Sequence, residues 1–437
     1  MTTLRFPLSR IEGHARVEME VQDGQVVSAQ FQALEMRGFR YFVLGTPAEQ
    51  MPVIVPRICG VCSTAHHVAS VKALEDIFDV TPPKLAREIR ELLLLGQLIQ
   101  NQATSLFIFT MPDRVGASSI FHMGEDEADP AQQLSMAQRA LKVRQMGTKL
   151  ITLAGGQFIH PVKAIIGGMT SGIKKEPADS MLSELKEMLT VVCTLFDAYW
   201  EMSLAMKERI GTWGDDQPAY YIASTGRSRP ELDSDTIRVL GPDGNERASF
   251  SPNLFRTYLK YEETEYSYAG QTSYQGQVMR ANSLARINLA LSMGTPLADV
   301  YLQKLTDSFG KPAHPILLFD LCRGIELVYA FERAIEMLSQ DLDYEDTSLP
   351  YAVKDGEGYG LVEAPRGPLI HHYIVKDGLI EDAEFIIPTT HNMLAIERAL
   401  MVAGKRYVSP EGINLELEKA VGRVVRAFDP CIACATQ

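Results

Sequence analysis

The sequence has 437 residues, of which 46% are hydrophobic and 22% are charged, and its formal net charge is -13. This composition is typical of a folded protein with a sizeable core, and the length would suffice for about three average domains. The negative charge argues against a nucleic-acid or anionic-membrane surface, because phosphate groups would be repelled. No stretch approaches the roughly 20 apolar residues of a membrane span, and the N-terminus lacks the apolar core of a signal peptide. We therefore expect no membrane span and a cytoplasmic location.

Near its start the chain has the pattern of β-strands, and several later segments have the pattern of helices. Residues 4–35 alternate polar and apolar side chains around Asp23-Gly24, which predicts a β-hairpin. Residues 66–77 are helix-compatible, and from Pro83 to Met111 apolar residues recur at helix spacing. Further segments lack internal Pro and carry apolar residues at three- and four-residue intervals: 131–153, 178–210, 281–293 and 322–340. Together these segments predict a central bundle of long helices.

The remaining segments have the patterns of strands and turns. Residues 211–280 are rich in Gly, Pro and Ser, with a turn at Gly241–Asn245, and predict an insertion of short strands and loops. Residues 360–387 alternate around Asp377-Gly378, which predicts a second hairpin. The fold class is therefore expected to be mainly α with smaller β parts (α+β). We predict one continuous unit over residues 1–437, with a β-rich part at 1–60, a helical core at 61–210 and 281–345, the insertion at 211–280 and a C-terminal part at 355–437.

Two C-x-x-C pairs are the strongest chemical signal. Cys59 and Cys62 lie near the start of the chain, and Cys431 and Cys434 lie just before its end. Four soft thiolates suit zinc, an iron-sulfur cluster or a thiophilic transition metal. Six cysteines in all are too few for a secreted disulfide scaffold, so the spacing favours metal. Because the pairs lie at opposite ends, the fold must bring the ends together; a structural zinc site remains open on spacing alone.

A histidine accompanies the first cysteine pair. If a helix begins at Cys62, His66 lies one turn further along the same face, and its imidazole can hydrogen-bond the thiolate. His67 would point elsewhere and is expected to be a structural histidine. We therefore assign His66 a supporting role beside the metal ligands.

Several segments, in their order and spacing, resemble the signatures of the nickel-iron hydrogenase large (catalytic) subunit. They are Arg10-Ile-Glu-Gly-His14, Arg37-Gly-Phe39, Arg57-Ile-Cys-Gly-Val-Cys-x-x-x-His66, Gly155-Gly-Gln-Phe-Ile-His-Pro161, Glu363-Ala-Pro-Arg-Gly367, Ile387-Pro-Thr-Thr390 and Asp429-Pro-Cys-x-x-Cys434. Other stretches, such as Glu35–Phe39 and Met293–Ala298, look most like the cytoplasmic, multi-subunit, cofactor-coupled group. The resemblance implies the nickel-dependent hydrogenase large-subunit fold and the reversible splitting of H2 into protons and electrons.

The resemblance also implies the ligands of the metals. Cys59 and Cys431 match the terminal nickel thiolates, and Cys62 and Cys434 match the thiolates that bridge nickel and iron. In the family, the iron also carries carbon monoxide and cyanide. Splitting H2 needs a Lewis-acidic metal to take hydride and a nearby base to take the proton, and a terminal thiolate can be that base.

Other matched residues surround these ligands. Glu12 matches the family's proton-relay carboxylate beside the terminal thiolate, and the alternative for Glu12 is an ion pair with Arg10. Arg366 matches the guanidinium held over the metals, where it and Thr389 would donate hydrogen bonds to cyanide. Pro388 supplies part of the apolar wall near the iron ligands.

Three features depart from the family pattern or lie at its edge. Arg40 and Gln437 stand where relatives usually have a Glu and a His that help to bind a divalent cation. A guanidinium could fill that position with its own charge, so we expect no magnesium there. Gln100-Asn101-Gln102 stands where relatives commonly place His or Asp. The chain stops where the family's processing protease cuts, and the sequence does not tell whether an extension was removed.

Electron transfer implies partners. Apart from the four paired cysteines, only Cys193 and Cys322 remain; each is expected to be a buried small hydrophobic residue, and two thiols cannot hold a cubane cluster. The expected partner is an iron-sulfur small subunit and, beyond it, flavin and iron-sulfur subunits of the diaphorase type that reach NAD(P) or ferredoxin. No Gly-x-Gly-x-x-Gly motif follows a strand, which argues against nicotinamide binding in this chain.

Three alternatives share parts of this pattern. A hydrogen sensor would use the same site with slow turnover, and a zinc scaffold would use the cysteines only for stability. The quinone-binding subunit of respiratory complex I has the same fold, but that branch lacks the four cysteines. Their presence argues against it.

Overall fold

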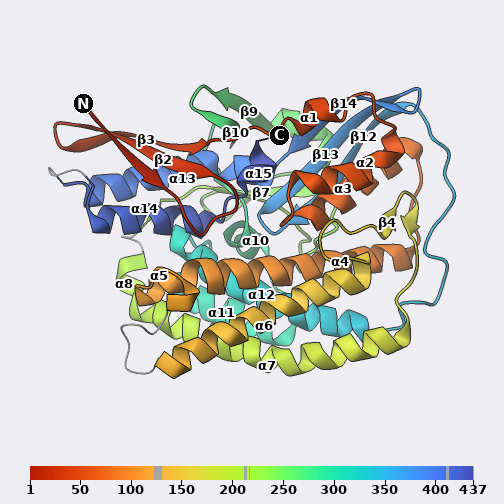
Figure 1. Ribbon diagram of the computed structural model, residues 1–437, viewed down its shortest axis with the longest axis horizontal. Helices are drawn as coiled ribbons and strands as arrows, with labels where there is room; N and C mark the ends of the chain where they lie inside the picture. Colours follow the sequence, from red (N-terminus) through yellow and green to blue (C-terminus); the bar gives the residue numbers. More distant parts are fainter. Residues whose placement is uncertain (123–129, 211–213, 216, 410–412, 437) are drawn as a thin grey trace.

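The computed structural model describes residues 1–122, 130–210, 214–215, 217–409 and 413–436, without the side chains of residues 130–135. A layer of long helices forms the lower half of the molecule in Figure 1, and small sheets with shorter helices form the upper half. The expected fold class, mainly α with smaller β parts around a bundle of long helices, is confirmed.

Four long helices make up the helical layer, and glycines set how closely they pack. A Cβ atom on Gly147 would lie 2.4 Å from the backbone nitrogen of Gln100. A Cβ atom on Gly324 would lie 1.9 Å from the ring of Phe196. Larger residues at either glycine would push the helices apart. The helices are α4 (Lys84–Ala103), α6 (Pro130–Gly155), α7 (Lys175–Ala205) and α12 (Phe319–Leu338).

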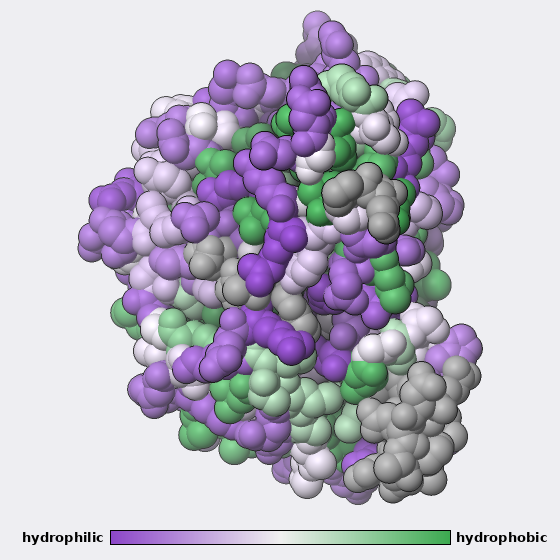
Figure 2. Space-filling view, turned by 90° about the vertical axis from the view of Figure 1, so that its left-hand side faces the viewer, coloured by the Kyte–Doolittle hydropathy of each residue, from purple (hydrophilic) through white to green (hydrophobic). Residues whose placement is uncertain are grey.

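The helix predicted from Pro83 to Met111 contains a π-helical turn, η3 (Thr104–Thr110), after which α5 (Met111–Val115) continues. Within the described chain, Lys84–Val115 is the one segment long and apolar enough to cross a membrane, with a mean hydropathy of 1.3, and 83% of its apolar window is buried in the protein. Such burial is that of a core helix. On the face shown in Figure 2, hydrophilic residues are spread widely, with hydrophobic residues between them.

The predicted N-terminal hairpin is confirmed, and it is part of a three-stranded sheet. Strands β2 (Ala15–Gln22) and β3 (Gln25–Ala33) pair antiparallel around Asp23 and Gly24, which both have positive φ. Strand β1 (Thr2–Pro7) adds to the other edge of β2. The alternation of apolar residues puts Val17 and Met19 into the core.

A second antiparallel sheet carries the first cysteine pair's helix. This sheet has the strands β12 (Gly356–Ala364), β13 (Gly367–Lys376) and β14 (Leu379–Ile386). The predicted C-terminal hairpin corresponds to β13 and β14, and β12 pairs with the other edge of β13. Helix α3 (Ser63–Phe78) lies on this sheet. A Cβ atom on Gly360 would lie 1.9 Å from the carbonyl oxygen of Ala69, so only glycine allows this contact.

The predicted insertion contains short strands, as expected. They are β6 (Tyr220–Ser224), β7 (Ile237–Leu240), β8 (Glu246–Phe250), β9 (Leu259–Thr264), β10 (Ser267–Tyr274) and β11 (Met279–Arg280). The helix predicted over residues 281–293 is only α10 (Ser283–Leu289), because the chain turns extended at Ala290 before Gly294. Helices that the periodicity did not predict are α11 (Pro296–Phe309), α13 (Pro388–Tyr407), α14 (Leu415–Phe428) and the short α15 (Ile432–Ala435).

The last residues of the chain lie against residues 12, 13 and 37, beside the β12–β14 sheet where Figure 1 marks the C-terminus, whereas the first residue lies far from this point. Glu12 and Cys431 form an isolated parallel β-bridge, and the Ile432 N–H donates to the Glu12 carbonyl over 3.3 Å. The Arg37 N–H donates to the Thr436 carbonyl over 2.6 Å. Gly13 has φ +79°, and a Cβ atom there would lie 2.7 Å from the Cβ atom of Ile432. The close approach therefore requires glycine.

Candidate metal centre

The first cysteine pair sits in a tight turn before α3. The 3-10 helix η2 (Val55–Ile58) ends at Cys59, which is extended with φ -150° and ψ 124°. Cys62 is the N-cap residue of α3, and its carbonyl accepts the first helical hydrogen bond from the N–H of His66. The turn between the two cysteines therefore directs both sulfur atoms into the protein.

The second pair repeats this arrangement at the other end. Helix α14 ends at Asp429, whose φ of 49° reverses the chain, and Pro430 follows. Cys431 is extended and caps α15, which contains Cys434. The Cys431 N–H donates to the hydroxyl oxygen of Thr389 over 3.0 Å, so this terminal segment is held by α13.

The four cysteine sulfurs form one compact group. All four lie within 4.8 Å of one another, and each residue is at most 5% exposed. The Cys431 sulfur is 3.3 Å from that of Cys59, 3.7 Å from that of Cys62 and 2.8 Å from that of Cys434. Burial raises the pKa of Cys431 and Cys434 well above its usual value. Buried thiols become thiolates when a metal binds them, so this donor set fits soft metal ions.

Arg366 reaches the group from the turn between β12 and β13. Its Nη1 donates to the Cys62 sulfur over 3.2 Å, and its Nη2 donates to Asp429 Oδ1 over 3.0 Å. Its Nε donates to the Asp429 carbonyl over 2.5 Å. Arg366 is 3% exposed, so it is not part of an exposed ion pair on the surface. A guanidinium fixed at three atoms places a permanent positive charge beside the thiolates.

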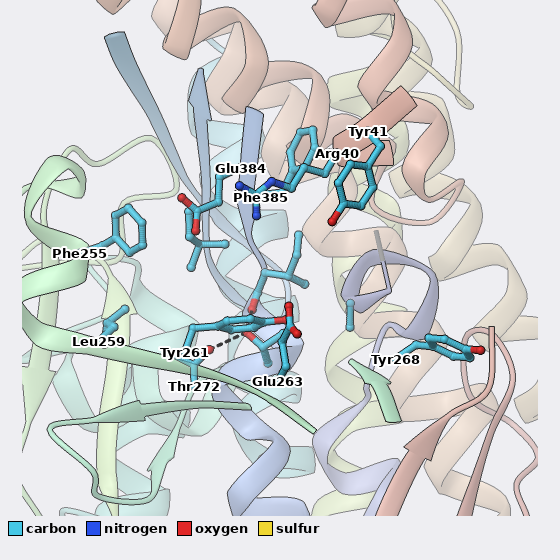
Figure 3. A pocket seen from close by; sticks show the side chains of 14 residues that line it. Arg40, Tyr41, Phe255, Leu259, Tyr261, Glu263, Tyr268, Thr272, Glu384 and Phe385 are labelled. Carbon is cyan, nitrogen blue, oxygen red and sulfur yellow. Dashed lines mark hydrogen bonds between the residues drawn. The ribbon is translucent and has the colours of Figure 1, made fainter. Parts of the chain in front are cut away.

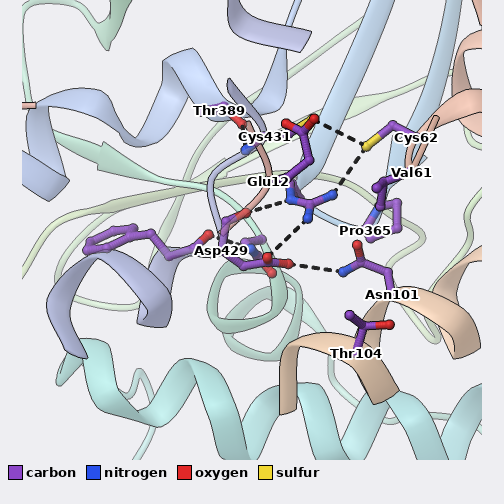
Figure 4. Close-up of polar contacts among 12 residues, drawn as sticks. Glu12, Val61, Cys62, Asn101, Thr104, Pro365, Thr389, Asp429 and Cys431 are labelled. Carbon is purple, nitrogen blue, oxygen red and sulfur yellow. Dashed lines mark hydrogen bonds and ion pairs between the residues drawn. The ribbon is translucent and has the colours of Figure 1, made fainter. Parts of the chain in front are cut away.

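A buried chain of amides and charges extends this contact into the helical layer. Asn101 Nδ2 donates to Asp429 Oδ2 over 3.1 Å, as Figure 4 shows, and to Gln102 Oε1 over 3.4 Å. Gln102 in turn donates to Glu326. Arg286 bridges Glu326 and Glu363, and burial raises the pKa of Glu363 to about 7. The amides noted in the sequence thus connect two buried ion-pair groups.

His66 contacts a different thiolate from the one predicted. It lies one turn after Cys62 as expected, but its Nε2 is 3.5 Å from the sulfur of Cys434. The ring leans across the site because its Nδ1 is 2.9 Å from Nε2 of His371 on β13. His67 points away, as predicted, with its Nδ1 2.8 Å from the Pro52 carbonyl oxygen.

A small pocket lies beside the sulfurs, and its free space is only about 10 Å³. Pro388 and Thr389 line it at the start of α13, opposite Ala364 and Leu369. Pro388 therefore lies next to the cysteines, where the apolar wall was expected.

Glu12 lies at the β-bridge to Cys431. Its Oε2 accepts a hydrogen bond from the Ala433 N–H over 3.0 Å, and Figure 4 shows it beside Cys431. Burial raises the pKa of Glu12, and the negative charge of Cys59 raises it further. The alternative ion pair with Arg10 is wrong, because Arg10 Nη2 is 2.5 Å from Asp113 Oδ1. Glu12 is therefore a partly buried carboxyl group at the edge of the cysteine group.

Arg40 lies on the short helix α1 (Phe39–Phe42), at a surface pocket rather than beside the sulfurs. Its Nη2 is 3.6 Å from Asp382 Oδ1, and its side chain is 46% exposed. Figure 3 shows it extending toward Glu384 at this pocket. Gln437, the other residue of the predicted cation position, lies outside the described residues.

Comparison with known proteins identifies the family. The model of the family described as nickel-dependent hydrogenase matches residues 37–139 and 239–437, well over half of the chain. This chain belongs to the nickel-dependent hydrogenase family. A second model, described as HoxL-like, matches residues 6–36. The four cysteines therefore belong to the catalytic large subunit of a hydrogenase that acts on H2, and the zinc scaffold is set aside.

Individual relatives agree with this assignment. The chain is 34% identical, over 91% of its length and 97% of the relative's, to a subunit of the vhu F420-non-reducing hydrogenase of Methanocaldococcus jannaschii. It is 28% identical, over 98% of its own length and 93% of the relative's, to the beta subunit of the NAD-reducing hydrogenase HoxS of Cupriavidus necator. Its fold matches a crystal structure of an NAD+-reducing [NiFe]-hydrogenase in the H2-reduced state with a TM-score of 0.92 at 29% identity, covering 100% of both chains. The resemblance inferred from the motifs is confirmed.

Some site residues were not assigned a role from the sequence. Asp429 belongs to the motif Asp429-Pro-Cys-x-x-Cys434, and its position directly before Pro430-Cys431 indicates that it lies close to the site. His371 and Glu326 carried no such signal, because each lies in an apolar stretch far from every cysteine ligand in sequence. Only the packing of β13 on α3 and of α12 on α4 brings them near.

Cys62→Ser and Cys434→Ser should each lose the metals, because a hydroxyl group is a hard and weakly acidic replacement for a soft thiolate. Nickel and iron, measured on the matured protein by elemental analysis, should fall from near one atom each per chain to near zero. Cys193→Ser is the matched control: Cys193 is half-buried on α7, less buried than expected, and lies outside the four-cysteine group, so both metals should stay. Full metal content in Cys434→Ser would contradict the assignment.

Proposed function

We propose that this hydrogenase subunit splits H2 reversibly and heterolytically, and that the electrons pass to an iron-sulfur partner subunit and on to a soluble carrier such as NAD(P) or ferredoxin. The observation that supports this proposal is the meeting of four buried sulfurs from opposite chain ends within 4.8 Å, in a family that depends on nickel. A hydrogen sensor would share the site and differ in rate. Turnover with an added redox dye separates the two.

The four thiolates of Cys59, Cys62, Cys431 and Cys434 would together hold nickel and iron. When bound, such a centre supplies the Lewis acidity that polarises H2 and accepts its electrons. The pocket lined by Pro388 and Thr389 would take the carbon monoxide and cyanide ligands of the iron.

Two side chains would orient and stabilise these groups. Arg366 keeps its positive charge next to the Cys62 sulfur and offsets part of the negative charge of the thiolates. The Thr389 oxygen accepts the Cys431 N–H, which leaves the hydroxyl proton of Thr389 to be donated into the pocket. Both would hydrogen-bond cyanide from opposite sides.

Glu12 would carry the proton away from Cys431. Its Oε2 is engaged by the Ala433 N–H, so the transferred proton would be held at Oε1. Burial raises the pKa of Glu12, which favours its taking up a proton, as a relay requires. This supports Glu12 as the first station of the proton path.

Electrons would leave through another chain. In the part of the chain that the structure describes, the four cysteines are the one group of at least three His, Cys, Asp or Glu side chains suited to a metal. A cluster for electron transfer would therefore belong to a partner, namely an iron-sulfur small subunit, with flavin-containing diaphorase-type subunits as further partners. The likeness to an NAD-reducing hydrogenase supports a soluble carrier and a cytoplasmic location.

Infrared spectroscopy of the matured complex tests the proposed centre directly. Absorption bands of metal-bound carbon monoxide and cyanide should appear, and they should be absent from Cys62→Ser. A spectrum of the wild-type complex without such bands, at full nickel and iron content, would overturn the proposal.

Magnesium should not bind behind the centre in this protein. Arg40 replaces a carboxylate ligand, and a guanidinium repels a divalent cation. Elemental analysis should find less than one magnesium per chain after dialysis. Arg40→Glu, which restores the carboxylate, is the matched variant and should raise the magnesium content; stoichiometric magnesium in the wild type would contradict this prediction.

Glu12→Gln should keep both metals and the infrared bands but slow the exchange of D2 with water protons by a factor on the order of 100 to 10,000. The amide oxygen can still accept the Ala433 N–H, but the amide cannot hold the transferred proton. Glu20→Gln, on β2 away from the site, is the matched control and should exchange at the wild-type rate. Undiminished exchange in Glu12→Gln would remove this residue from the relay.

A further inference from the structure

A polar pocket lies at the end of the molecule that carries the N-terminal sheet, between α5 and α14 (Figure 1). Its free space is about 410 Å³, which is within the range of small-molecule sites. Residues 6–10 form one wall, α5 and the turn after it form the second, and residues 415–426 of α14 form the third. None of the four metal-site cysteines lines it, so the pocket is separate from the metal centre.

Two guanidinium groups that line this pocket share one carboxylate. Arg10 Nη2 is 2.5 Å from Asp113 Oδ1, and Arg426 places Nη2 3.0 Å from the same oxygen and Nε 2.7 Å from Oδ2. Arg426 Nη1 also donates to the Ser9 carbonyl over 3.2 Å, and Arg10 Nη1 donates to the Phe109 carbonyl. The three charged side chains are 7–16% exposed. One negative charge thus faces two positive charges that are largely buried.

A second group beside the first has the same imbalance. Arg114 Nη2 is 3.0 Å from Asp320 Oδ2, and Arg323 Nη1 is 2.9 Å from Asp320 Oδ1. These side chains are at most 3% exposed. Arg423, which is partly buried, lines both the open pocket and a small hollow that Asp113, Arg114 and Asp320 also line. Arg423 therefore lies where the two groups meet.

Positive charge exceeds negative charge at this place, although the whole chain carries a net charge of -13. At the rim of the pocket, Lys419 and Glu416 pair with each other at 3.7 Å, and Glu418 is exposed to water, which screens its charge. Burial lowers the pKa of both Arg423 and Arg426, as expected where cations lack sufficient anionic partners. Among the described residues, the two groups hold five guanidinium groups and two carboxylates: Arg10, Arg114, Arg323, Arg423 and Arg426 with Asp113 and Asp320.

Buried positive charge is stable only when an anion accompanies it. We propose that this pocket binds a phosphate group, either as the free ion or as part of a small phosphate ester, with Arg423 as its main contact. Guanidinium groups suit phosphate because their N–H groups form forked pairs of charge-assisted hydrogen bonds. In the part of the chain that the structure describes, the buried Arg10 Nε has no hydrogen-bond partner, so a further donor is present at the pocket.

The position of the pocket gives the bound anion a structural consequence. Arg10 precedes Glu12 by two residues, and Arg426 precedes Asp429 by three. An anion in contact with the guanidinium groups would therefore link the segment that carries Glu12 to the helix that leads to Cys431. This role goes beyond the proposed hydrogenase reaction, because no step of that reaction requires the pocket.

The test is calorimetric titration of the matured complex with sodium phosphate, in phosphate-free buffer and with sodium chloride at equal ionic strength as the reference. Phosphate should bind one saturable site per large subunit, and it should raise the thermal unfolding temperature as its concentration rises. Glycerol 3-phosphate distinguishes the two sources of the phosphate group. An ester that binds more tightly than phosphate indicates a phosphorylated molecule, and equal or weaker binding indicates the free ion.

Arg423→Gln should weaken phosphate binding at least about tenfold, because it removes a charged donor. Arg423→Lys should weaken it less, since lysine keeps the charge but not the fork. Lys419→Gln, at the exposed rim, should cost roughly two- to fivefold. Lys84→Gln is the matched control: it removes one positive charge at the opposite end of the Lys84–Val115 segment, so its affinity should equal that of the wild type.

Three results would overturn the inference. The first is an absence of phosphate binding, or of thermal stabilisation, beyond that given by chloride. The second is wild-type affinity in Arg423→Gln with full nickel and iron content. The third is a loss in Lys84→Gln as large as that in Arg423→Gln, which would show a non-specific response to net charge. If Arg423→Gln does not fold, Arg423→Lys and the exposed Lys419→Gln decide the matter, because wild-type affinity in both would equally exclude the site.

Discussion

The site depends on holding the last residues of the chain inside the protein. Chain ends usually fray, because few contacts compensate the entropy lost on ordering them. Here Ile432, Thr436 and Cys431 each bond to a different segment: the Glu12 carbonyl, the Arg37 N–H and the Thr389 hydroxyl. Gly13 lets the N-terminal segment lie directly against Ile432. Without this closure, two of the four sulfurs would be lost from the centre.

Charge balance is the second constraint around the centre. Four thiolates brought together in the core would repel one another, and bound metal ions together with Arg366 would provide the compensating positive charge. Arg366 is itself buried and is neutralised by Asp429. Further out, Arg286 pairs with Glu326 and Glu363. The neutral amides of Asn101 and Gln102 connect the two groups and add no charge between them.

The two sides of the centre have different surroundings, and this difference suits different tasks. Glu12 lies on the partly exposed side next to Cys431, which would let a proton leave toward solvent in the proposed relay. His66 lies on the opposite, fully buried side next to Cys434, where its partners belong to α3 and β13. A proton path needs access to water, whereas a side chain that supports a metal ligand benefits from rigid surroundings.

The sequence by itself indicated the two hairpins and most of the long core helices, because periodicity is a local property, and it indicated the four cysteines as one metal site. Glu12 and Arg366 became site candidates because their motifs resemble those of the hydrogenase family. It also indicated that the chain ends must meet, since both cysteine pairs serve one site. Only the tertiary structure decided which sulfur each neighbour contacts: His66 faces Cys434 rather than Cys62, because His371 approaches from β13. It likewise decided that Arg10 pairs with Asp113, and that Glu326 joins the buried network. These contacts link residues tens to hundreds of positions apart, and no local pattern specifies them; they arise from how the helices and sheets pack.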